Sequence, residues 1–233
     1  MKTLVICSGG LDSVTLAHKI ADEHELIGLI AFDYGQRHKK ELAYAKKCAK
    51  TLNVAYNMVD ISSVGALLSG SALTDNVDVP DGHYAENSMK LTVVPNRNAI
   101  MLTIAYGIAS SRGADAVATA VHGGDHFIYS DCRPDFAKSF QNMQDFALDE
   151  HIKLYTPFID ISKAGIAAQS AEFNVPVIDT WSCYKGGENH CGRCGTCVER
   201  IEAFHIANVP DPTKYDDPDF WINTTENTNQ GTA

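Results

Sequence analysis

Short apolar runs alternate with amphipathic segments from the first residues of the chain. The run at residues 2–7 is short and β-branched and the run at 26–32 is nearly continuous, which predicts strands buried on both faces, and residues 54–61 predict a third strand. Residues 12–23 and 40–52 instead carry apolar residues at helical spacing. This alternation of strand and helix predicts a doubly wound parallel α/β sheet of the Rossmann-like kind.

The alternation stops at residues 62–90, where Gly, Ser, Asp, Asn and Pro predict a long irregular insertion. After it we expect a short extended segment at 91–94, a helix at 99–111 and a strand at 114–121. Three further segments with helical spacing lie at 134–150, 162–172 and 198–207. The last residues are rich in Asp, Asn and Thr, which predicts a poorly ordered tail.

The composition favours a globular chain: 45% of its 233 residues are hydrophobic, enough for one full core and a small appended lobe. The formal net charge of −10, from 19 basic and 29 acidic residues, argues against a protein that mainly grips nucleic-acid phosphates. The apolar run at 3–7 is too short for a signal segment or a membrane span. We therefore expect a cytoplasmic protein with no membrane contact and no direct nucleic-acid contact.

A glycine-rich loop separates the first predicted strand from the first predicted helix, with the sequence Ser8-Gly9-Gly10-Leu11-Asp12-Ser13. Two glycines let the backbone turn tightly and approach a ligand, and a helix N-terminus adds partial positive charge. The loop therefore predicts a pyrophosphate cradle in which Ser13 donates its hydroxyl and Asp12 holds Mg²⁺. The alternative is a plain strand–helix turn with a polar cap.

The hexapeptide resembles the PP-loop signature of N-type ATP pyrophosphatases, which cleave ATP between the α and β phosphates and adenylate a substrate. The resemblance implies ATP as cosubstrate and an adenine nucleotide alpha hydrolase-like fold. The loop lacks the lysine of a Walker loop and the spacing of a dinucleotide fingerprint, so neither of those motifs applies.

Four of the seven cysteines form a C-x7-C-x2-C-x2-C cluster, made of Cys183, Cys191, Cys194 and Cys197. Four thiolates close a tetrahedron around Zn²⁺ without an open position, which predicts a structural zinc. An iron–sulfur cluster uses the same ligands and stays open as an alternative. We accordingly divide the chain into a PP-loop α/β domain at 1–180, a zinc-binding knuckle with a C-terminal helix at 181–215, and a flexible tail at 216–233.

Two further polar segments follow predicted strands, where ligands bind in open α/β sheets. In the first, Arg97 can pair with a phosphate or a carboxylate and Asn98 can cap a helix; a solvated turn is the alternative. The second begins at His122 and leads to Asp131 and Arg133. A hydrogen-bonded loop histidine is the alternative to a functional one.

Taken together, five blocks resemble the QueC family, the 7-cyano-7-deazaguanine synthases of the queuosine pathway. The blocks are residues 8–13, the Phe-Asp-Tyr-Gly-Gln-Arg-His run at 32–38, residues 94–98, residues 129–136, and the cysteine knuckle with Asp211-Pro212-Thr213 beyond it. The resemblance implies a ligase and a homodimer. ATP would activate the carboxylate of 7-carboxy-7-deazaguanine, ammonia would give the amide, and a second ATP would lead to the nitrile.

Positions in the chain suggest roles in this reaction. The nucleotide is expected to contact Cys7, Ser8, Gly9, Gly10, Leu11, Asp12, Ser13, Phe32 and Tyr34. Catalysis is assigned to Ser8, Asp12, Ser13 and Arg97, where Arg97 takes the substrate carboxylate or the α-phosphate. The deazaguanine is expected near Asn98, Asp131 and Arg133, where a carboxylate can bind its guanidine-like edge.

Two departures from the family pattern are visible. The position of Asn96 is often glycine in the family, and many members carry Cys-Glu-Thr-Asp where this chain has residues 122–125. Three alternatives stay open: a variant that stops at the amide, another PP-loop enzyme that modifies tRNA, and a non-catalytic zinc-ribbon binding module. The sequence does not separate nitrile from amide, nor tRNA from DNA as the destination of the product, nor does it identify the ammonia source.

Overall fold

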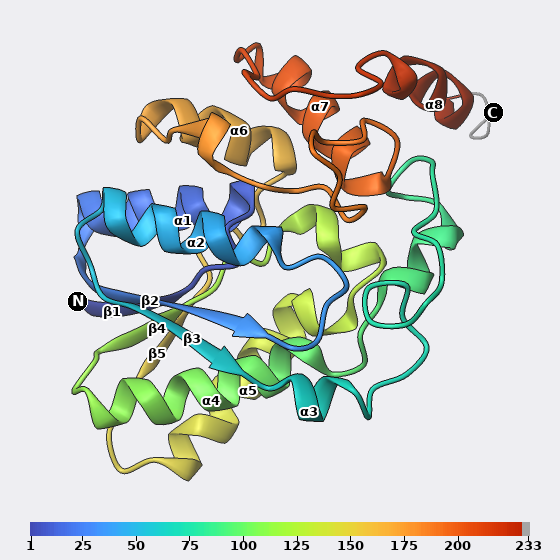
Figure 1. Ribbon diagram of the computed structural model, residues 1–233. Coiled ribbons are helices and arrows are strands. Elements are labelled where there is room, and N and C mark those ends of the chain that lie inside the picture. The colour runs from blue at the N-terminus through green and yellow to red at the C-terminus, as the bar shows by residue number, and fades with distance from the viewer. Residues whose placement is uncertain (230–233) are drawn as a thin grey trace.

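Five parallel strands form the centre of the protein. The computed structural model describes residues 1–229 and places the strands in the order β3-β2-β1-β4-β5 (Figure 1). Their bounds are Lys2–Ile6 (β1), Glu25–Asp33 (β2), Tyr56–Asp60 (β3), Ala116–Ala118 (β4) and Lys153–Tyr155 (β5). Every pair of neighbouring strands is parallel, so the predicted parallel α/β class is confirmed.

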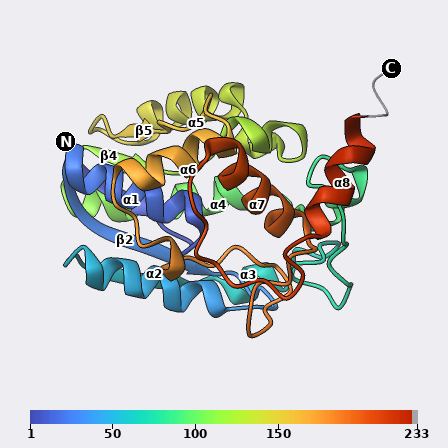
Figure 2. The same ribbon diagram turned by 90° about the horizontal axis from the view of Figure 1, so that it is seen from above.

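Helices cover both faces of the sheet, as a doubly wound fold requires. One face carries α1 (Leu11–Glu23), α2 (Lys40–Thr51) and α6 (Lys163–Glu172). The opposite face carries α4 (Arg97–Ser111) and α5 (Pro134–Ala147) (Figure 1). Seen from above, α1, α2 and α6 lie together over the strands (Figure 2). Each face of the sheet is therefore shielded from water.

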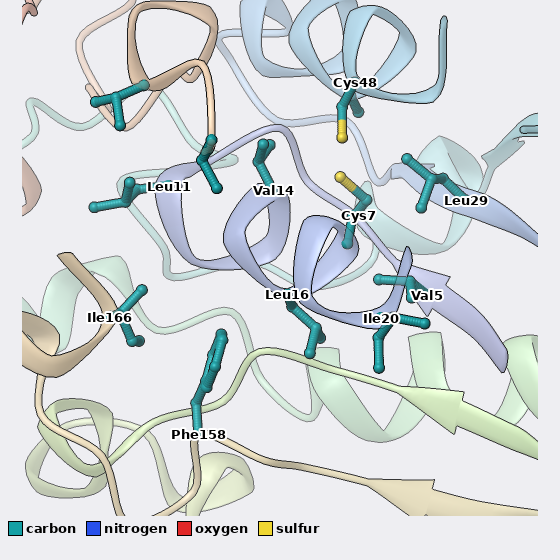
Figure 3. Packing of buried hydrophobic residues seen from close by; sticks show 14 of the residues in the cluster. Val5, Cys7, Leu11, Val14, Leu16, Ile20, Leu29, Cys48, Phe158 and Ile166 are labelled. Atoms are coloured by element: carbon teal, nitrogen blue, oxygen red, sulfur yellow. The ribbon is translucent and has the colours of Figure 1, made fainter. Parts of the chain in front are cut away.

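The apolar stripe of α1 fixes the position of this helix. Leu16 and Ile20 are fully buried and belong to one apolar cluster with Phe158 and Ile166 (Figure 3). Burial of one such side chain contributes about 1.5–3 kcal/mol. Because α1 is held in this way, the glycine-rich loop before it is held against the end of β1.

The ligand-binding crevice of the fold lies where the strand order reverses. Strand β1 pairs with β2 on one side and with β4 on the other. Connections from the two sides leave in opposite directions, so the carboxyl ends of β1 and β4 open a gap between loops. The glycine-rich loop follows β1, and residues 119–126 follow β4. The glycine-rich loop and the polar segment that begins at His122 therefore meet at this point.

The remaining elements lie outside the sheet layers. They are α3 (Ser62–Gly65), α7 (Gly195–Ala207), α8 (Phe220–Asn229) and the 3₁₀ helices Asn87–Thr92, Gly123–Phe127, Ser130–Cys132 and Val177–Asp179. The predicted insertion packs on the cysteine region, where the Gly82 N–H donates to the Arg193 carbonyl at 3.1 Å. No helix within residues 1–229 is both long enough and apolar enough to cross a membrane.

Three features differ from the sequence-based expectations. The extended segment expected at 91–94 begins inside a 3₁₀ helix, because the Thr92 hydroxyl and the Val93 N–H bond to nearby carbonyls instead of a neighbouring strand. Strand β5 was not predicted, because three residues are too few to show a periodic pattern. Helix α8 lies within the segment expected to be a flexible tail, of which residues 230–233 fall outside the described residues.

Asn96 explains one departure from the family pattern. It precedes α4 and adopts the left-handed conformation, with φ 56° and ψ 22°. Glycine enters this region freely, and asparagine is among the few other residues that do so at low cost. Asn96 therefore meets the same backbone requirement as the glycine that the family resemblance led us to expect at this position.

Candidate functional site

The glycine-rich loop wraps around the hydroxyl of Ser13. This oxygen accepts the Ser8 N–H at 3.1 Å and lies 3.2 Å from both the Ser8 hydroxyl and the Gly10 carbonyl. Helix α1 has no side-chain cap at its N-terminus. Its first N–H groups are therefore free to bind an anion, which the helix dipole also favours.

Gly9 is required by both its conformation and its surroundings. Its φ is +89°, and a Cβ atom would lie 2.2 Å from the Glu41 carbonyl oxygen and 2.7 Å from the Ala45 nitrogen. Any side chain here would collide with the backbone of α2. Gly9 thus lets the loop pack against α2 while the N–H groups of α1 face the crevice.

A cavity of about 250 Å³ opens above this loop. Most of the residues predicted as site residues line it: Cys7, Ser8, Gly10, Leu11, Asp12, Ser13, Phe32, Tyr34, Arg97 and Asn98. Gly9, Asp131 and Arg133 do not. The structure therefore brings together the predicted nucleotide-binding loop and Arg97, which are separated by more than eighty residues in the sequence.

An ion-pair network crosses the floor of the cavity. The Lys163 ammonium lies 2.7 Å from Asp12 Oδ2 and 3.3 Å from Glu199 Oε2. Burial alone would raise the pKa of Asp12, but the charge of Lys163 and its hydrogen bond hold it below its usual value. Burial raises the pKa of Asp125, which also lines the cavity. Asp12 is therefore an anion in the resting site.

The tautomer of His122 is fixed by its surroundings. The ring is buried, and Nδ1 accepts the Gly124 N–H at 3.1 Å. Nε2 must then carry the proton, and it faces Asp125 Oδ2 at 3.5 Å and Asp12 Oδ2 at 3.8 Å. His122 is thus a hydrogen-bonded loop residue whose contacts orient two carboxylates of the cavity.

Arg97 occupies the opposite side of the cavity among tyrosines. Its Nη1 lies 3.5 Å from the Tyr34 hydroxyl, and its Cζ lies 5.7 Å from the centre of that ring. Tyr129 and Tyr184 also line the cavity. Within residues 1–229 no carboxylate forms a salt bridge with Arg97. The guanidinium is consequently available to an anionic ligand.

A second unpaired ionisable group lines the same cavity. The Glu41 carboxylate accepts a hydrogen bond from Gln36 Nε2 at 3.1 Å. Burial raises the pKa of Glu41 to about 7, although Arg97 and the Gln36 hydrogen bond oppose this effect. Glu41 was not among the residues predicted from the sequence.

Asp131 and Arg133, which were predicted to contact the deazaguanine, instead form hydrogen bonds with backbone groups. Asp131 Oδ2 accepts the backbone N–H of Asn98 at 2.9 Å, so it caps the first turn of α4. Arg133 is exposed, and its Nε donates to the His126 carbonyl at 3.0 Å. Asp131 therefore supports Arg97 by holding the helix end that carries it, and neither side chain lines the cavity.

The four cysteines predicted as metal ligands meet at the start of α7. Their sulfur atoms all lie within 4.8 Å of one another. A tetrahedral zinc with Zn–S bonds of about 2.3 Å needs sulfur–sulfur separations of about 3.8 Å, and Cys191 Sγ lies 3.9 Å from Cys197 Sγ. Backbone N–H groups point at the sulfur of Cys191 from residues 193 and 194. The donor set and its spacing therefore fit a metal ion.

Arg200 connects the segments around the cysteine cluster to one another through hydrogen bonds. The guanidinium is fully buried and donates to the hydroxyls of Thr180, Ser182 and Thr213. Its Nε lies 3.5 Å from Asp211 Oδ2. Since Ser182 also borders the cavity, the knuckle forms one wall of the site.

One cavity residue that sequence reasoning missed carried a readable signal. Lys163 is the first residue of α6, where the helix dipole disfavours a cation, so a charge stands where local stability would not place it. Glu199 was missed as well and carried no such signal, because its chain neighbours are Val198 and Arg200 and only the fold brings it to the cavity.

Comparison with known proteins places these features in a family. The family model described as "Queuosine biosynthesis protein QueC" matches residues 2–208. The 7-cyano-7-deazaguanine synthase of Rhizobium meliloti (strain 1021) is 67% identical over 227 residues, covering 97% of this chain and 96% of the relative. The protein of the same name from Ruegeria pomeroyi is 67% identical over 223 residues, covering 95% of this chain and 97% of the relative.

A solved structure shares the fold. The NMN synthetase from Francisella tularensis is similar with a TM-score of 0.51 and 16% identity, covering 97% of this chain and 85% of that chain. At this identity the likeness concerns the fold alone.

Proposed function

The chain belongs to the family of the queuosine biosynthesis protein QueC, and from that premise we propose that it is an ATP-dependent ligase. In this proposal it converts 7-carboxy-7-deazaguanine and ammonia into 7-cyano-7-deazaguanine, the compound whose synthesis gives its curated relatives their name. The proposal rests chiefly on one observation. A single cavity joins an uncapped PP-loop helix to Arg97, a guanidinium that forms no salt bridge with a carboxylate of residues 1–229.

The PP-loop side of the cavity suits the phosphates of ATP. The free N–H groups of α1 and the hydroxyls of Ser8 and Ser13 can bind phosphate oxygens. Lys163 adds a cation within reach of the same loop. One oxygen of Asp12 is buried without a hydrogen-bond partner, so Asp12 fits a Mg²⁺ ion that neutralises charge on the phosphates.

Arg97 supplies charge where the reaction develops it. A carboxylate oxygen of the substrate attacks the α-phosphorus of ATP, and pyrophosphate leaves. Ammonia then adds to the acyl carbon and AMP leaves with one carboxylate oxygen, which gives the amide. The amide oxygen attacks a second ATP in the same way, and loss of AMP gives the nitrile. A fixed guanidinium in a partly desolvated cavity orients the carboxylate and stabilises the α-phosphate during transfer.

The cysteine cluster has a structural part in this account. Zn²⁺ would be held by Cys183, Cys191, Cys194 and Cys197, which leaves no open coordination position. The ion would order the segment that carries Ser182 and Tyr184 to the cavity wall. The proposal also includes a homodimer, which rests on the family resemblance, and a cytoplasmic location, because a reducing compartment keeps four clustered cysteines free to bind a metal.

Isotope transfer tests the adenylation step directly. The substrate carboxylate is labelled with ¹⁸O and incubated with the enzyme, ammonium and Mg·ATP, and the AMP is analysed by mass spectrometry. The proposal predicts AMP that carries ¹⁸O, because the carboxylate oxygen leaves with the α-phosphate. AMP without label, formed alongside product, would show that the carboxylate is not adenylated.

A further inference from the structure

The cavity contains a carboxylate that forms no salt bridge with any described residue. Glu41 lies in the first turn of α2 and lines the cavity. The two preceding lysines are both turned elsewhere. Lys39 pairs with Asp33 at 2.6 Å, and Lys40 donates to two backbone carbonyls and lies over the Trp181 ring. Among the described residues no salt bridge involves Glu41.

Gln36 holds this carboxylate in place. Gln36 is buried, and its Oε1 accepts the Tyr34 N–H at 2.9 Å. Its Nε2 donates to the Phe32 carbonyl at 3.2 Å and to Glu41 Oε1 at 3.1 Å. Every hydrogen-bonding atom of the amide is thus used, which fixes its orientation. One carboxylate oxygen of Glu41 is fastened, and the other stays free to accept.

The helix dipole alone does not account for this arrangement. The helix dipole favours a carboxylate in the first turn of a helix. This stabilisation is also available to a carboxylate that points into solvent, so it does not explain why the Glu41 side chain lines a cavity. Glu41 is half-buried, and partial burial of a charge without a salt bridge costs free energy. An anchored, unpaired carboxylate in a ligand cavity is therefore best explained by a ligand that donates hydrogen bonds to it.

Glu41 and Arg97 both line the cavity, which therefore offers a ligand one anionic acceptor and one cation. A ligand complementary to both has a hydrogen-bond donor edge at one end and an anionic group at the other. The substrate of the proposed function has this form, because the N1–H and 2-amino groups form its donor edge and a carboxylate is attached at C7. We propose that Glu41 recognises the N1–H and 2-amino edge of the deazaguanine base and thereby determines base specificity. This inference rests on the proposed function.

The adenine of ATP is the competing source of an amino group. Adenine presents its 6-amino group beside N1, which is an acceptor and would face the carboxylate unfavourably. The guanine-like edge presents two adjacent donors, which matches a carboxylate. The observations thus favour the deazaguanine base over adenine.

A substrate analogue without the 2-amino group tests the assignment. We compare kcat/KM for 7-carboxy-7-deazaguanine and for this analogue at saturating Mg·ATP in the wild type, Glu41→Gln and Glu41→Asp. In the wild type, loss of the donor should lower kcat/KM by about ten- to a hundredfold, as expected for a hydrogen bond to a charged group. In Glu41→Gln the two substrates should differ by less than about threefold, with KM for ATP within about twofold of the wild type.

Glu41→Asp keeps the charge but withdraws it by one methylene. Its ratio of kcat/KM for the two substrates should therefore lie between that of the wild type and that of Glu41→Gln. Glu172→Gln, on the exposed end of α6, is the matched control and should discriminate like the wild type. Equal discrimination in the wild type and Glu41→Gln would overturn the assignment. A raised KM for ATP with discrimination intact would assign Glu41 to adenine instead. A folded wild type that turns over neither substrate would refute the proposed function itself, and with it this inference.

Discussion

The Lys163 ammonium lies 2.7 Å from the Asp12 carboxylate, although 151 residues separate them in the sequence. This contact joins the first residue of α6 to the PP-loop. It places a cation where the helix dipole is unfavourable, so the position is set by the cavity and not by the stability of α6. Lys163 thus becomes a phosphate-binding candidate through the fold alone.

Replacement of Lys163 by Ala should lower kcat by about 100-fold or more, which is typical of losing one charged group that stabilises a transferring phosphoryl group. Steady-state release of AMP measures the effect. Lys138→Ala, on the exposed side of α5, should retain wild-type kcat. Circular dichroism of Lys163→Ala must show a folded protein, because loss of a buried ion-pair partner also destabilises. Full activity in this variant would remove Lys163 from the mechanism.

Replacement by alanine should have opposite effects on stability at Gly9 and at Gly107. Gly9→Ala introduces a Cβ against the α2 backbone at a φ of +89°. We expect loss of ATP turnover and a lower melting temperature. Gly107 lies in α4 with no atom within 4 Å of its added Cβ, so Gly107→Ala should stabilise the protein by roughly 0.5–1 kcal/mol. Thermal unfolding of both variants checks this, and an unchanged Gly9→Ala would mean that the loop packs differently.

The stability of the ligand-free protein should depend on pH through Glu41. Its pKa is raised to about 7 in the folded protein by burial, against 4.5 as the ordinary value. The folded state therefore binds this proton more tightly than the unfolded state, and stability is lost as pH rises from 4.5 through about 7. Arg97 and Gln36 face the carboxylate and reduce this loss without removing it.

Glu41→Gln should consequently melt at a higher temperature than the wild type at pH 8, with a much smaller advantage at pH 5. Glu172→Gln should show no such pH-dependent difference. Scanning calorimetry at the two pH values makes the comparison. A Glu41→Gln variant that is less stable than the wild type at pH 8 would show that the carboxylate is well paired in the folded protein.

The four-cysteine cluster predicts a definite metal content for the purified protein. Elemental analysis of the purified protein should find one zinc per chain and no stoichiometric iron. Cys194→Ser should lose the metal and melt at a lower temperature, because ligand loss removes the binding free energy that orders the knuckle. Cys48→Ser, at a buried cysteine outside the cluster, should keep one zinc. Iron with a visible absorption spectrum would favour the cluster alternative.

The sequence predicted the parts of the fold that carry strong periodic patterns. The apolar runs before and after α1 and the glycine-rich loop between them were predicted close to their observed bounds. Strand β5 was missed because Lys153–Tyr155 is too short to show a pattern. Local hydrogen bonding decided the conformation of Thr92, which periodicity does not register.

Candidate site residues were predictable where a motif concentrates them and unpredictable where the fold assembles them. The PP-loop and Arg97 lie in recognisable segments, and both line the cavity. Asp131 and Arg133 also lie in such a segment, yet Asp131 caps α4 and Arg133 is exposed. In the sequence, Glu41 is indistinguishable from any acidic residue in the first turn of a helix. Its role as a candidate becomes visible only in the structure, where it lines the cavity, Lys39 and Lys40 contact other groups, and Gln36 holds its carboxylate.

The most direct test of the central claim is mass-spectrometric identification of the product from 7-carboxy-7-deazaguanine, ammonium and Mg·ATP, with the zinc-loaded protein. The account predicts 7-cyano-7-deazaguanine with two AMP formed per nitrile. Accumulation of the amide alone would contradict nitrile formation and assign the chain to an amide-forming branch. The absence of both products from a folded, zinc-loaded protein would contradict the synthase function altogether.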